Sequence, residues 1–314
     1  MAGIWRWLKL RAVVYLFRFI SNFRLRQVAK QDLLLAGDIQ PRRVYIPSRD
    51  PRRDIIGDLY YPPDLSSSSS PNKRPILVNW HGSGFIIPSL GNDRAFCAQV
   101  ARETGIIVLD ADYRKAPENP FPAAINDVED TLKWISTRPD EFDASKVAVS
   151  GFSAGGNLAL VASSSLRQGL DDAGINIVAV AALYPVTDLS LDPVAKKVPN
   201  PVRPMPAVFA VIWEDCYAPD ASQRSDPRIS PSLAATASFP ETVAIITAEG
   251  DTLSPEAIAL ALALEKTDKT VVNKTMPGMP HGFDKGCTKG TKEWDQREIA
   301  YYLVIHSLRE AFKL

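Results

Sequence analysis

The chain has little cysteine and little histidine. Its 314 residues include three cysteines, Cys97, Cys216 and Cys287, which are far apart and form no C-x-x-C pair, and only three histidines. An odd number of scattered cysteines excludes a disulfide scaffold, and no cysteine or histidine spacing indicates a zinc site. We therefore expect a reducing compartment and no structural metal. Any catalytic base of the histidine type must be one of three residues.

Long apolar runs and an excess of charge are also missing. The longest uninterrupted apolar run of the N-terminal segment is Ala12–Phe17. A membrane span needs about 20 apolar residues and a signal-peptide core about 7–15, so we expect a cytoplasmic protein. Lys and Arg number 36, as do Asp and Glu, which gives zero net charge. That balance argues against nucleic acid as a partner, because polyanion binding requires a basic surface.

The zero net charge conceals an uneven distribution. Residues 1–31 contain no acidic residue and seven basic ones: Arg6, Lys9, Arg11, Arg18, Arg24, Arg26 and Lys30. At 100° per residue, one side of a helix here would carry Leu8, Ala12, Tyr15, Phe19 and Phe23, and another side Arg11, Arg18 and Asn22. One interpretation is an amphipathic helix packed on the rest of the protein. The other is a helix lying on a lipid surface, which would give the chain a peripheral membrane contact.

Downstream, short apolar segments alternate with helical patterns. The expected strands are Ile76–Trp80, Ile106–Ala111, Val147–Ser150, Val178–Leu183, Val243–Ala248 and Val271–Thr275. The expected helices are Asp93–Glu103, Ile125–Thr137, Gly155–Arg167, Pro255–Lys266 and Lys292–Phe312. Strands that are apolar on both faces and separated by helices predict an α/β fold, with a mostly parallel central sheet and helices on both faces.

Residues 189–232 interrupt this alternation. The segment contains eight prolines and is too long for a structureless loop, so we predict a lid or cap. Its apolar side chains include Met205, Val208, Phe209, Ile212 and Trp213. These residues could line an apolar pocket or simply dock the cap on the core.

The strongest local signal is Gly151-Phe152-Ser153-Ala154-Gly155-Gly156, which follows an expected strand and begins an expected helix. This is G-x-S-x-G in the strand–turn–helix context of a nucleophile elbow, where Ser153 would be the nucleophile. A serine needs a base to accept its proton. His281 lies in a turn-rich loop after the last expected strand, where catalytic residues of open α/β sheets gather, whereas His306 falls inside a helix.

The acid that orients this histidine should follow a strand between the serine and the histidine. We choose Asp251, with Glu249 as the competitor and a helix-capping role for Asp251 as an alternative. The segment His81-Gly82-Ser83-Gly84 is similar to an H-G-G-G oxyanion loop. The backbone amides of Ser83, Gly84 and Ala154 are the expected oxyanion donors, and His81 would organise the loop.

These motifs resemble those of the hormone-sensitive lipase and arylacetamide deacetylase-like carboxylesterases. Asp112-Tyr113-Arg114-Lys115-Ala116-Pro117-Glu118, followed by Phe121-Pro122-Ala123-Ala124, is similar to another signature of that family. The chain departs from the family pattern at Ser83, Phe152 and Thr252, none of which is a triad position. The resemblance implies a single α/β-hydrolase domain over residues 1–314, with a cap built from about 1–50 and about 189–232.

The predicted function is hydrolysis of carboxylic esters of small to medium apolar substrates through an acyl-enzyme intermediate, with no cofactor. An acyl transferase or an amidase could use the same triad. A non-catalytic receptor on this scaffold is disfavoured, because the receptors that resemble this family lack the catalytic histidine. The sequence leaves open whether the chain forms a homodimer.

Overall fold

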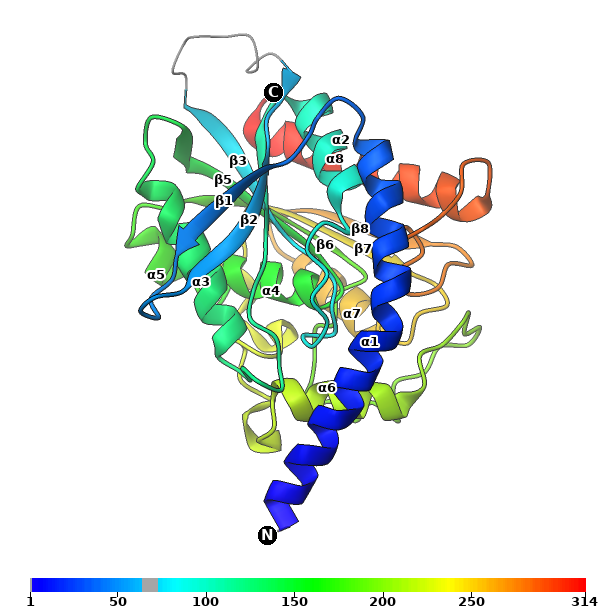
Figure 1. Ribbon diagram of the computed structural model, residues 1–314. Coiled ribbons are helices and arrows are strands. Elements are labelled where there is room, and N and C mark those ends of the chain that lie inside the picture. The colour runs from blue at the N-terminus through cyan, green and yellow to red at the C-terminus, as the bar shows by residue number, and fades with distance from the viewer. Residues whose placement is uncertain (1, 64–72) are drawn as a thin grey trace.

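The computed structural model describes residues 2–63 and 73–314 (Figure 1). Its centre is an eight-stranded sheet with the order β1-β2-β4-β3-β5-β6-β7-β8. The strands are β1 (Arg42–Pro47), β2 (Asp54–Tyr60), β3 (Arg74–Trp80), β4 (Ile107–Ala111), β5 (Phe142–Phe152), β6 (Ile177–Leu183), β7 (Thr242–Ala248) and β8 (Thr270–Met276). From β4 to β8 all neighbouring strands are parallel, while β1 and β2 are antiparallel to their neighbours. The predicted mostly parallel sheet is therefore confirmed.

The two antiparallel strands were not predicted. Strand β1 falls inside the segment 1–50 that we assigned to the cap, yet it pairs with β2 along its whole length. Its burial pattern alternates because it lies at the edge of the sheet, so it lacks the continuous apolar run of the central strands. Strand β2 contains the buried, charged Asp58, which pairs with Arg43. This residue interrupts the apolar run by which a buried strand is predicted from sequence. Only residues before β1 can therefore belong to an N-terminal part of the cap.

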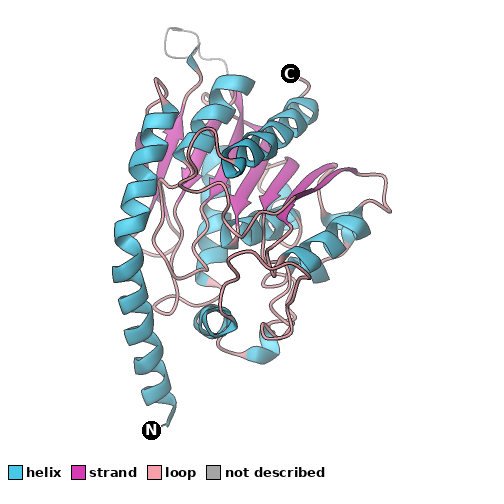
Figure 2. Ribbon diagram, turned by 90° about the vertical axis from the view of Figure 1, so that its right-hand side faces the viewer, coloured by secondary structure: helices cyan, strands magenta, loops and turns pink. Residues whose placement is uncertain are grey.

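Helices cover both faces of the sheet (Figure 2). One face carries α2 (Arg94–Thr104) and α8 (Lys292–Phe312), and the other carries α3 (Ala123–Ser136), α4 (Ala154–Ser163) and α7 (Ser254–Leu264). The short α5 (Arg167–Asp171) is separate from α4, so the single helix expected over Gly155–Arg167 is wrong at its C-terminal end. Two apolar cores, one on each face, fix the loops at the carboxyl ends of the strands.

The N-terminal helix α1 (Ala2–Ala36) runs along the side of the molecule, and its N-terminus projects beyond the body (Figures 1 and 2). It packs through Val14, Val28 and the Arg18 side chain, which donates to the carbonyl of Ile86 at 2.7 Å and pairs with Glu118 at 2.8 Å. The predicted apolar side, with Phe19 79% exposed, faces solvent instead. None of the helices in the described part of the chain is long and apolar enough to span a membrane.

The proline-rich segment 189–232 forms an irregular layer over the carboxyl ends of the strands. It contains α6 (Ala207–Tyr217), the 3₁₀ turn Ala221–Gln223 and the start of the turn Pro231–Leu233, and a further 3₁₀ turn, Thr236–Ser238, follows it. A nearly buried ion pair joins it to the core: Lys196 lies 2.7 Å from Glu256 on α7. Glu256 also accepts hydrogen bonds from the amides of Thr187 and Asp188, where the chain leaves the sheet. The segment is thus fixed by buried charge as well as by apolar contact.

Replacing Lys196 with methionine should lower the free energy of unfolding by about 3–5 kcal/mol, because it leaves the buried Glu256 without its partner. Burial already raises the pKa of Glu256, and it raises the pKa of the neighbouring Glu214 to about 7. Carboxyls whose pKa is raised by folding destabilise the protein at high pH, so the loss should shrink as the pH falls from about 8 to 6. Denaturant unfolding at several pH values measures this.

The matched control is Lys133→Met, which breaks a half-exposed helical pair of the same 2.7 Å length with Glu129 on the surface of α3. Exposed pairs contribute little, so this change should cost less than about 0.5 kcal/mol. Equal losses in the two variants would show that the Lys196 pair does not anchor the cap segment.

Candidate active site

The turn between β5 and α4 is as sharp as the glycine pattern indicates. Ser153 has φ 53° and ψ −117°, a strained conformation that projects its hydroxyl from the end of the strand. A Cβ on Gly151 would lie 2.2 Å from the carbonyl oxygen of Gly155, and one on Gly155 would lie 1.9 Å from that of Trp80. Only glycine fits at either position, which is the structural reason for the G-x-S-x-G spacing.

The structure brings Ser153, His281 and Asp251 together in one hydrogen-bonded row. The Ser153 hydroxyl lies 2.9 Å from Nε2 of His281, and Nδ1 of His281 lies 2.7 Å from Oδ2 of Asp251. Ser153 follows β5, His281 follows β8 and Asp251 follows β7. These strands belong to the parallel part of the sheet, so their carboxyl ends point in the same direction. This arrangement can move a proton from the serine to the imidazole.

The competitor Glu249 occupies a different place. Its carboxylate accepts the amide hydrogen of Gly278 at 2.6 Å in the loop that precedes His281. Asp251 also retains a local role, since its second oxygen accepts the amide of Leu253 at 3.1 Å just before α7. This contact closes a turn in the loop and is not a helix cap, because the N-cap residue of α7 is Leu253 and it receives no side-chain cap hydrogen bond. The capping alternative for Asp251 is therefore wrong, and its other oxygen contacts His281.

The environment of His281 favours its protonated form. Burial alone lowers the pKa of the imidazole, but the charge and hydrogen bond of Asp251, helped by the charge of Asp284, outweigh it and raise the pKa above its ordinary value. Tyr184 packs edge-on against the ring with centroids 4.9 Å apart, and its hydroxyl donates to Asp284 at 2.6 Å. The imidazole is thus held in place from two sides and is prepared to accept a proton.

The loop after β3 presents unpaired amides beside Ser153. Within the described part of the chain, the amides of Ser83 and Gly84 donate to no protein acceptor, and Ala154 is the first residue of α4. Buried amides rarely remain without a partner, so these groups are suited to a ligand oxygen. Gly84 has φ 55°, and a Cβ there would lie 3.0 Å from Trp213, which explains the glycine.

The hydroxyl of Ser83 is occupied within the loop. Tyr113 donates to the carbonyl of His81 at 2.9 Å, so the Ser83 hydroxyl, 2.5 Å from the tyrosine oxygen, donates to Tyr113 and accepts the amide of Phe85. His81 is fully buried and lies 3.1 Å from Asp112, and burial, reinforced by the charge of Lys115, lowers its pKa. These contacts fit the expected organising role of His81. The same contacts give a structural role to the Asp112–Lys115 segment, since Asp112 and Tyr113 both bind His81.

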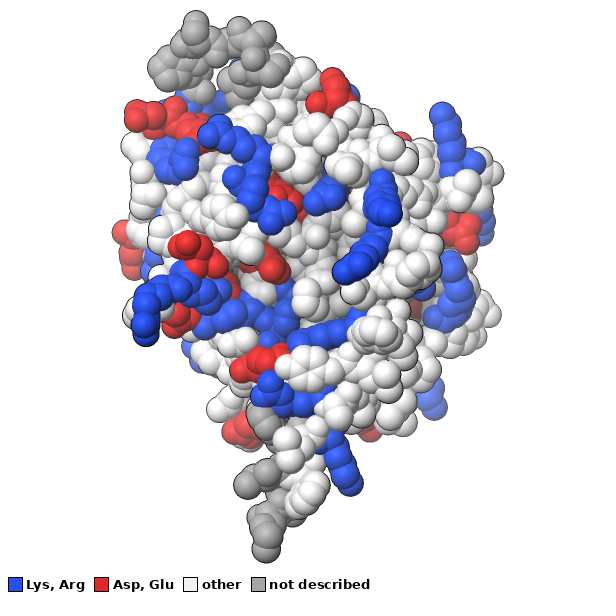
Figure 3. All heavy atoms as spheres, in the orientation of Figure 1, with Lys and Arg blue, Asp and Glu red and all other residues white. Residues whose placement is uncertain are grey.

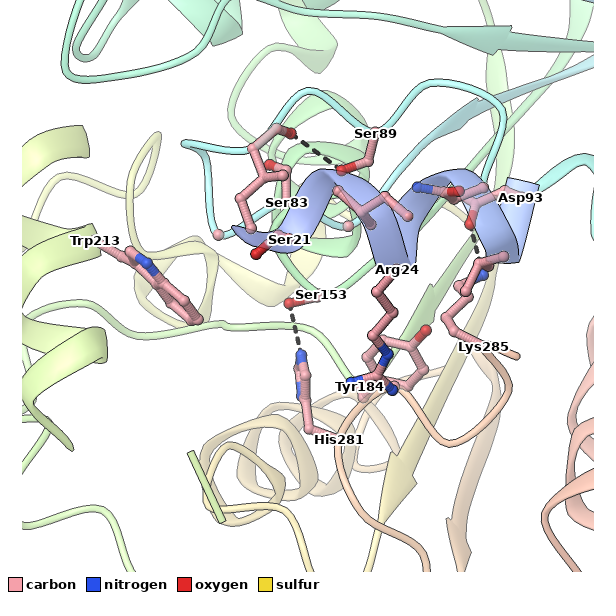
Figure 4. Close-up of a pocket in the computed structure, with 17 residues that line it drawn as sticks. Ser21, Arg24, Ser83, Ser89, Asp93, Ser153, Tyr184, Trp213, His281 and Lys285 are labelled. Atoms are coloured by element: carbon pink, nitrogen blue, oxygen red, sulfur yellow. Dashed lines mark hydrogen bonds and ion pairs between the residues drawn. The ribbon is translucent and has the colours of Figure 1, made fainter. Parts of the chain in front are cut away.

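Two cavities share Ser153 and Trp213 in their walls. Figure 4 shows the larger one, with Ser153 beside His281 and Trp213 on another side. The larger, of about 320 Å³, is lined by His281, Tyr184 and Lys285 and by residues of α1 that include Ser21 and Arg24. The smaller, of about 50 Å³, is apolar and is lined by Ala154, Val186, Leu189, Met205 and other residues, but not by His281. Of the cap side chains singled out in the sequence, Met205 and Trp213 line a cavity, whereas Phe209 packs on Phe17 of α1.

Sequence reasoning missed Tyr184 and Lys285, although it had placed the N-terminal segment in the cap, and α1 does line the larger cavity. Tyr184 directly follows β6, and this position at the carboxyl end of a strand was the only sequence feature that could have marked it as a site residue. Lys285 reaches Asp93 and Asp284 across the back of the pocket, contacts that no local pattern shows. No group of three His, Cys, Asp or Glu residues in the described ranges could hold a metal ion.

Comparisons with known proteins agree with this architecture. A family model described as the alpha/beta hydrolase fold matches residues 77–285. Carboxylesterase NlhH of Mycobacterium tuberculosis is 30% identical over 274 residues, which cover 84% of this chain and 81% of that protein. Ethyl acetate hydrolase of Pseudomonas putida is 30% identical over 209 residues, which cover 66% of this chain and only 65% of that protein.

Among solved structures, EstE1, a thermostable carboxylesterase cloned from a metagenomic library, superposes with a TM-score of 0.74 at 28% identity. That match covers 93% of this chain and 97% of EstE1. The esterase LipW of Mycobacterium marinum gives a TM-score of 0.76 at 25% identity, covering 95% and 90% of the two chains. The chain therefore belongs to the α/β-hydrolase fold family, among its hormone-sensitive lipase-like carboxylesterases.

Proposed function

We propose that this chain hydrolyses small carboxylic esters through an acyl-enzyme on Ser153. The observation that carries the proposal is the row Asp251–His281–Ser153, joined at 2.7 and 2.9 Å, at the meeting point of two cavities. Ser153 attacks the acyl carbon while His281 accepts its proton. Asp251 holds the tautomer and stabilises the imidazolium, and the amides of Ser83, Gly84 and Ala154 bind the oxyanion.

Each cavity can be assigned to one part of the ester from the destination of the proton that His281 holds. Nε2 must return that proton to the departing alkoxide, so the alcohol group has to lie on the histidine's side. The larger cavity includes His281 and therefore holds the alcohol. The smaller cavity lacks it and holds the acyl chain. Water then takes the alcohol's place beside His281 and releases the carboxylic acid.

The small cavity limits the acyl chain. A cavity needs about 10–15 Å³ of such space to hold one water molecule, so a space of about 50 Å³ accommodates only a short acyl chain. The similarity to an enzyme named for ethyl acetate hydrolysis supports a short acyl group. We therefore assign the substrate as a small-molecule ester with a short acyl part and a larger alcohol part. It would meet the enzyme in the cytoplasm.

A panel of p-nitrophenyl esters and the matching anilides tests this proposal. We expect kcat/KM to be highest for acetyl or propionyl esters and to fall by at least about tenfold for octanoyl, because an apolar pocket that is too small must be strained to admit the longer chain. Hydrolysis of anilides but of no ester would contradict the proposal and favour the amidase. Failure on both series, with acyl transfer to an added alcohol, would favour the transferase.

The variant Trp213→Ala is the matched test of the cavity assignment. Trp213 forms the wall between the two spaces, and its loss should raise octanoyl relative to acetyl turnover by about tenfold or more. The control is Val208→Ala, in the same helix but 59% exposed, which should leave the preference unchanged. An unchanged chain-length profile in Trp213→Ala would show that the acyl chain lies elsewhere.

A further inference from the structure

Helix α1 exposes a continuous apolar face that the fold does not use. This face, here called the outer face, consists of seven large side chains that are 41–79% exposed: Trp5, Leu8, Val13, Leu16, Phe19, Ile20 and Phe23. Tyr15 at its margin is not part of it, because its hydroxyl accepts a hydrogen bond from Arg11 and the Arg18 guanidinium lies over its ring. At 100° per residue they occupy one half of the helix surface, opposite the buried Val14 and Val28. Soluble proteins rarely expose an apolar patch of this extent without a partner.

The outer face is not needed to hold the helix in place. Other side chains make the contacts with the body: Arg18 reaches Ile86 and Glu118, and Gln31 donates to the carbonyl of Cys287 at 2.7 Å. Phe17 packs on the rings of Phe209 and Trp213. The outer face is therefore free to bind something outside this chain.

The charge around this face favours an anionic occupant. The first 31 residues contain no acid, and the exposed Lys9, Arg26 and Lys30 lie on the same half of the helix as the apolar side chains. Figure 3 shows the surface along α1 as white with separate Lys and Arg side chains in blue. Pairing two copies of this helix would bring like charges together, whereas anionic lipid headgroups would attract them.

The same helix also lines the substrate cavity. Ser21, Arg24, Leu25 and Val28, on or beside the inward half of α1, form part of the wall of the larger cavity. A surface bound to the outer face would therefore lie next to the space to which we assigned the alcohol part of the ester.

From these observations we propose that the outer face of α1 docks on an anionic lipid surface. Aromatic and aliphatic side chains enter the interface, and Lys9, Arg26 and Lys30 contact the headgroups. The mouth of the alcohol cavity then lies beside the lipid, where apolar esters concentrate. The docking step does not depend on Ser153 chemistry, so its failure and the failure of the proposed function can be distinguished.

Co-sedimentation of the full chain with vesicles tests the proposal. We expect binding to phosphatidylcholine vesicles that contain about 30% phosphatidylserine, and weaker binding to phosphatidylcholine alone. The triple variant Phe19→Ser, Ile20→Ser, Phe23→Ser should reduce partitioning on the order of 100-fold, since it removes three apolar side chains from the interface. Lys9→Gln with Lys30→Gln should reduce it roughly 25-fold, at about fivefold per lysine.

The control replaces three exposed large side chains elsewhere, Tyr45→Ser, Leu262→Ser and Tyr302→Ser, and should bind vesicles like the wild type. All variants should keep the wild-type melting temperature and the wild-type rate on p-nitrophenyl acetate. Unchanged vesicle binding in the outer-face triple variant would overturn the proposal. So would a wild-type dimer in analytical ultracentrifugation that the triple variant abolishes while no form binds vesicles.

Discussion

Replacing Ser153 with alanine should lower kcat on p-nitrophenyl acetate on the order of 10⁶-fold, provided that serine and histidine act as a unit. The change removes the hydroxyl that is hydrogen-bonded to His281 at the meeting point of the two cavities. Residual hydrolysis would come from the oxyanion amides and from substrate binding alone. The substitution removes one hydroxyl group and leaves the packing around position 153 intact, so the melting temperature should remain within a few degrees of the wild type.

Ser163→Ala provides the control for the nucleophile variant. Ser163 lies at the other end of α4, is buried, and donates to the carbonyl of Leu160 at 3.1 Å. Its replacement should leave kcat within a few-fold of the wild type. Retention of most esterase activity by Ser153→Ala, in protein purified free of host esterases, would remove Ser153 from the mechanism.

The variant Asp251→Asn should lower kcat by about 10⁴-fold, because an asparagine amide holds the imidazole in the wrong tautomer. It should also change the pH profile. The wild-type kcat/KM falls as His281 becomes protonated, and its raised pKa places that midpoint above about 6.5. Without the carboxylate, burial dominates and lowers the pKa, so the midpoint of the variant should move to lower pH.

Glu249→Gln separates the two candidate acids. Glu249 contacts the amide of Gly278 rather than the imidazole, so its replacement should reduce kcat by only a few-fold and leave the pH midpoint unchanged. A larger loss in Glu249→Gln than in Asp251→Asn would reverse the assignment. Equal pH profiles for Asp251→Asn and the wild type would show that Asp251 does not set the pKa of His281.

The central strands could be predicted from the sequence because they are buried on both faces and therefore read as continuous apolar runs. Helix α8 begins and ends at the predicted residues Lys292 and Phe312. The two antiparallel strands could not be predicted, since β1 alternates between exposed and buried positions and β2 contains Gly57 and the buried Asp58. The orientation of α1 was inaccessible too, because Arg18 finds its partners about 70–100 residues away in sequence.

The candidate site was predictable to the extent that it depends on strand ends. Ser153, Asp251 and His281 follow three strands whose carboxyl ends lie on one side of the sheet, and local spacing identified each of them. The division of the pocket by Trp213 was not predictable, because it arises when the cap segment packs over Gly84. The bond between Ser83 and Tyr113 likewise joins positions 30 residues apart.

The most direct test of the central claim is covalent labelling of the wild-type protein with a p-nitrophenyl alkylphosphonate, followed by intact and peptide mass spectrometry. The phosphonyl group of this reagent takes the position that the acyl group has in an ester substrate. The serine oxygen bonds to phosphorus, and p-nitrophenolate leaves. We predict a single adduct on Ser153, much slower labelling of Asp251→Asn, and no adduct on Ser153→Ala. An adduct on another residue, or equal labelling of Ser153→Ala, would contradict the claim that Ser153 carries the acyl group.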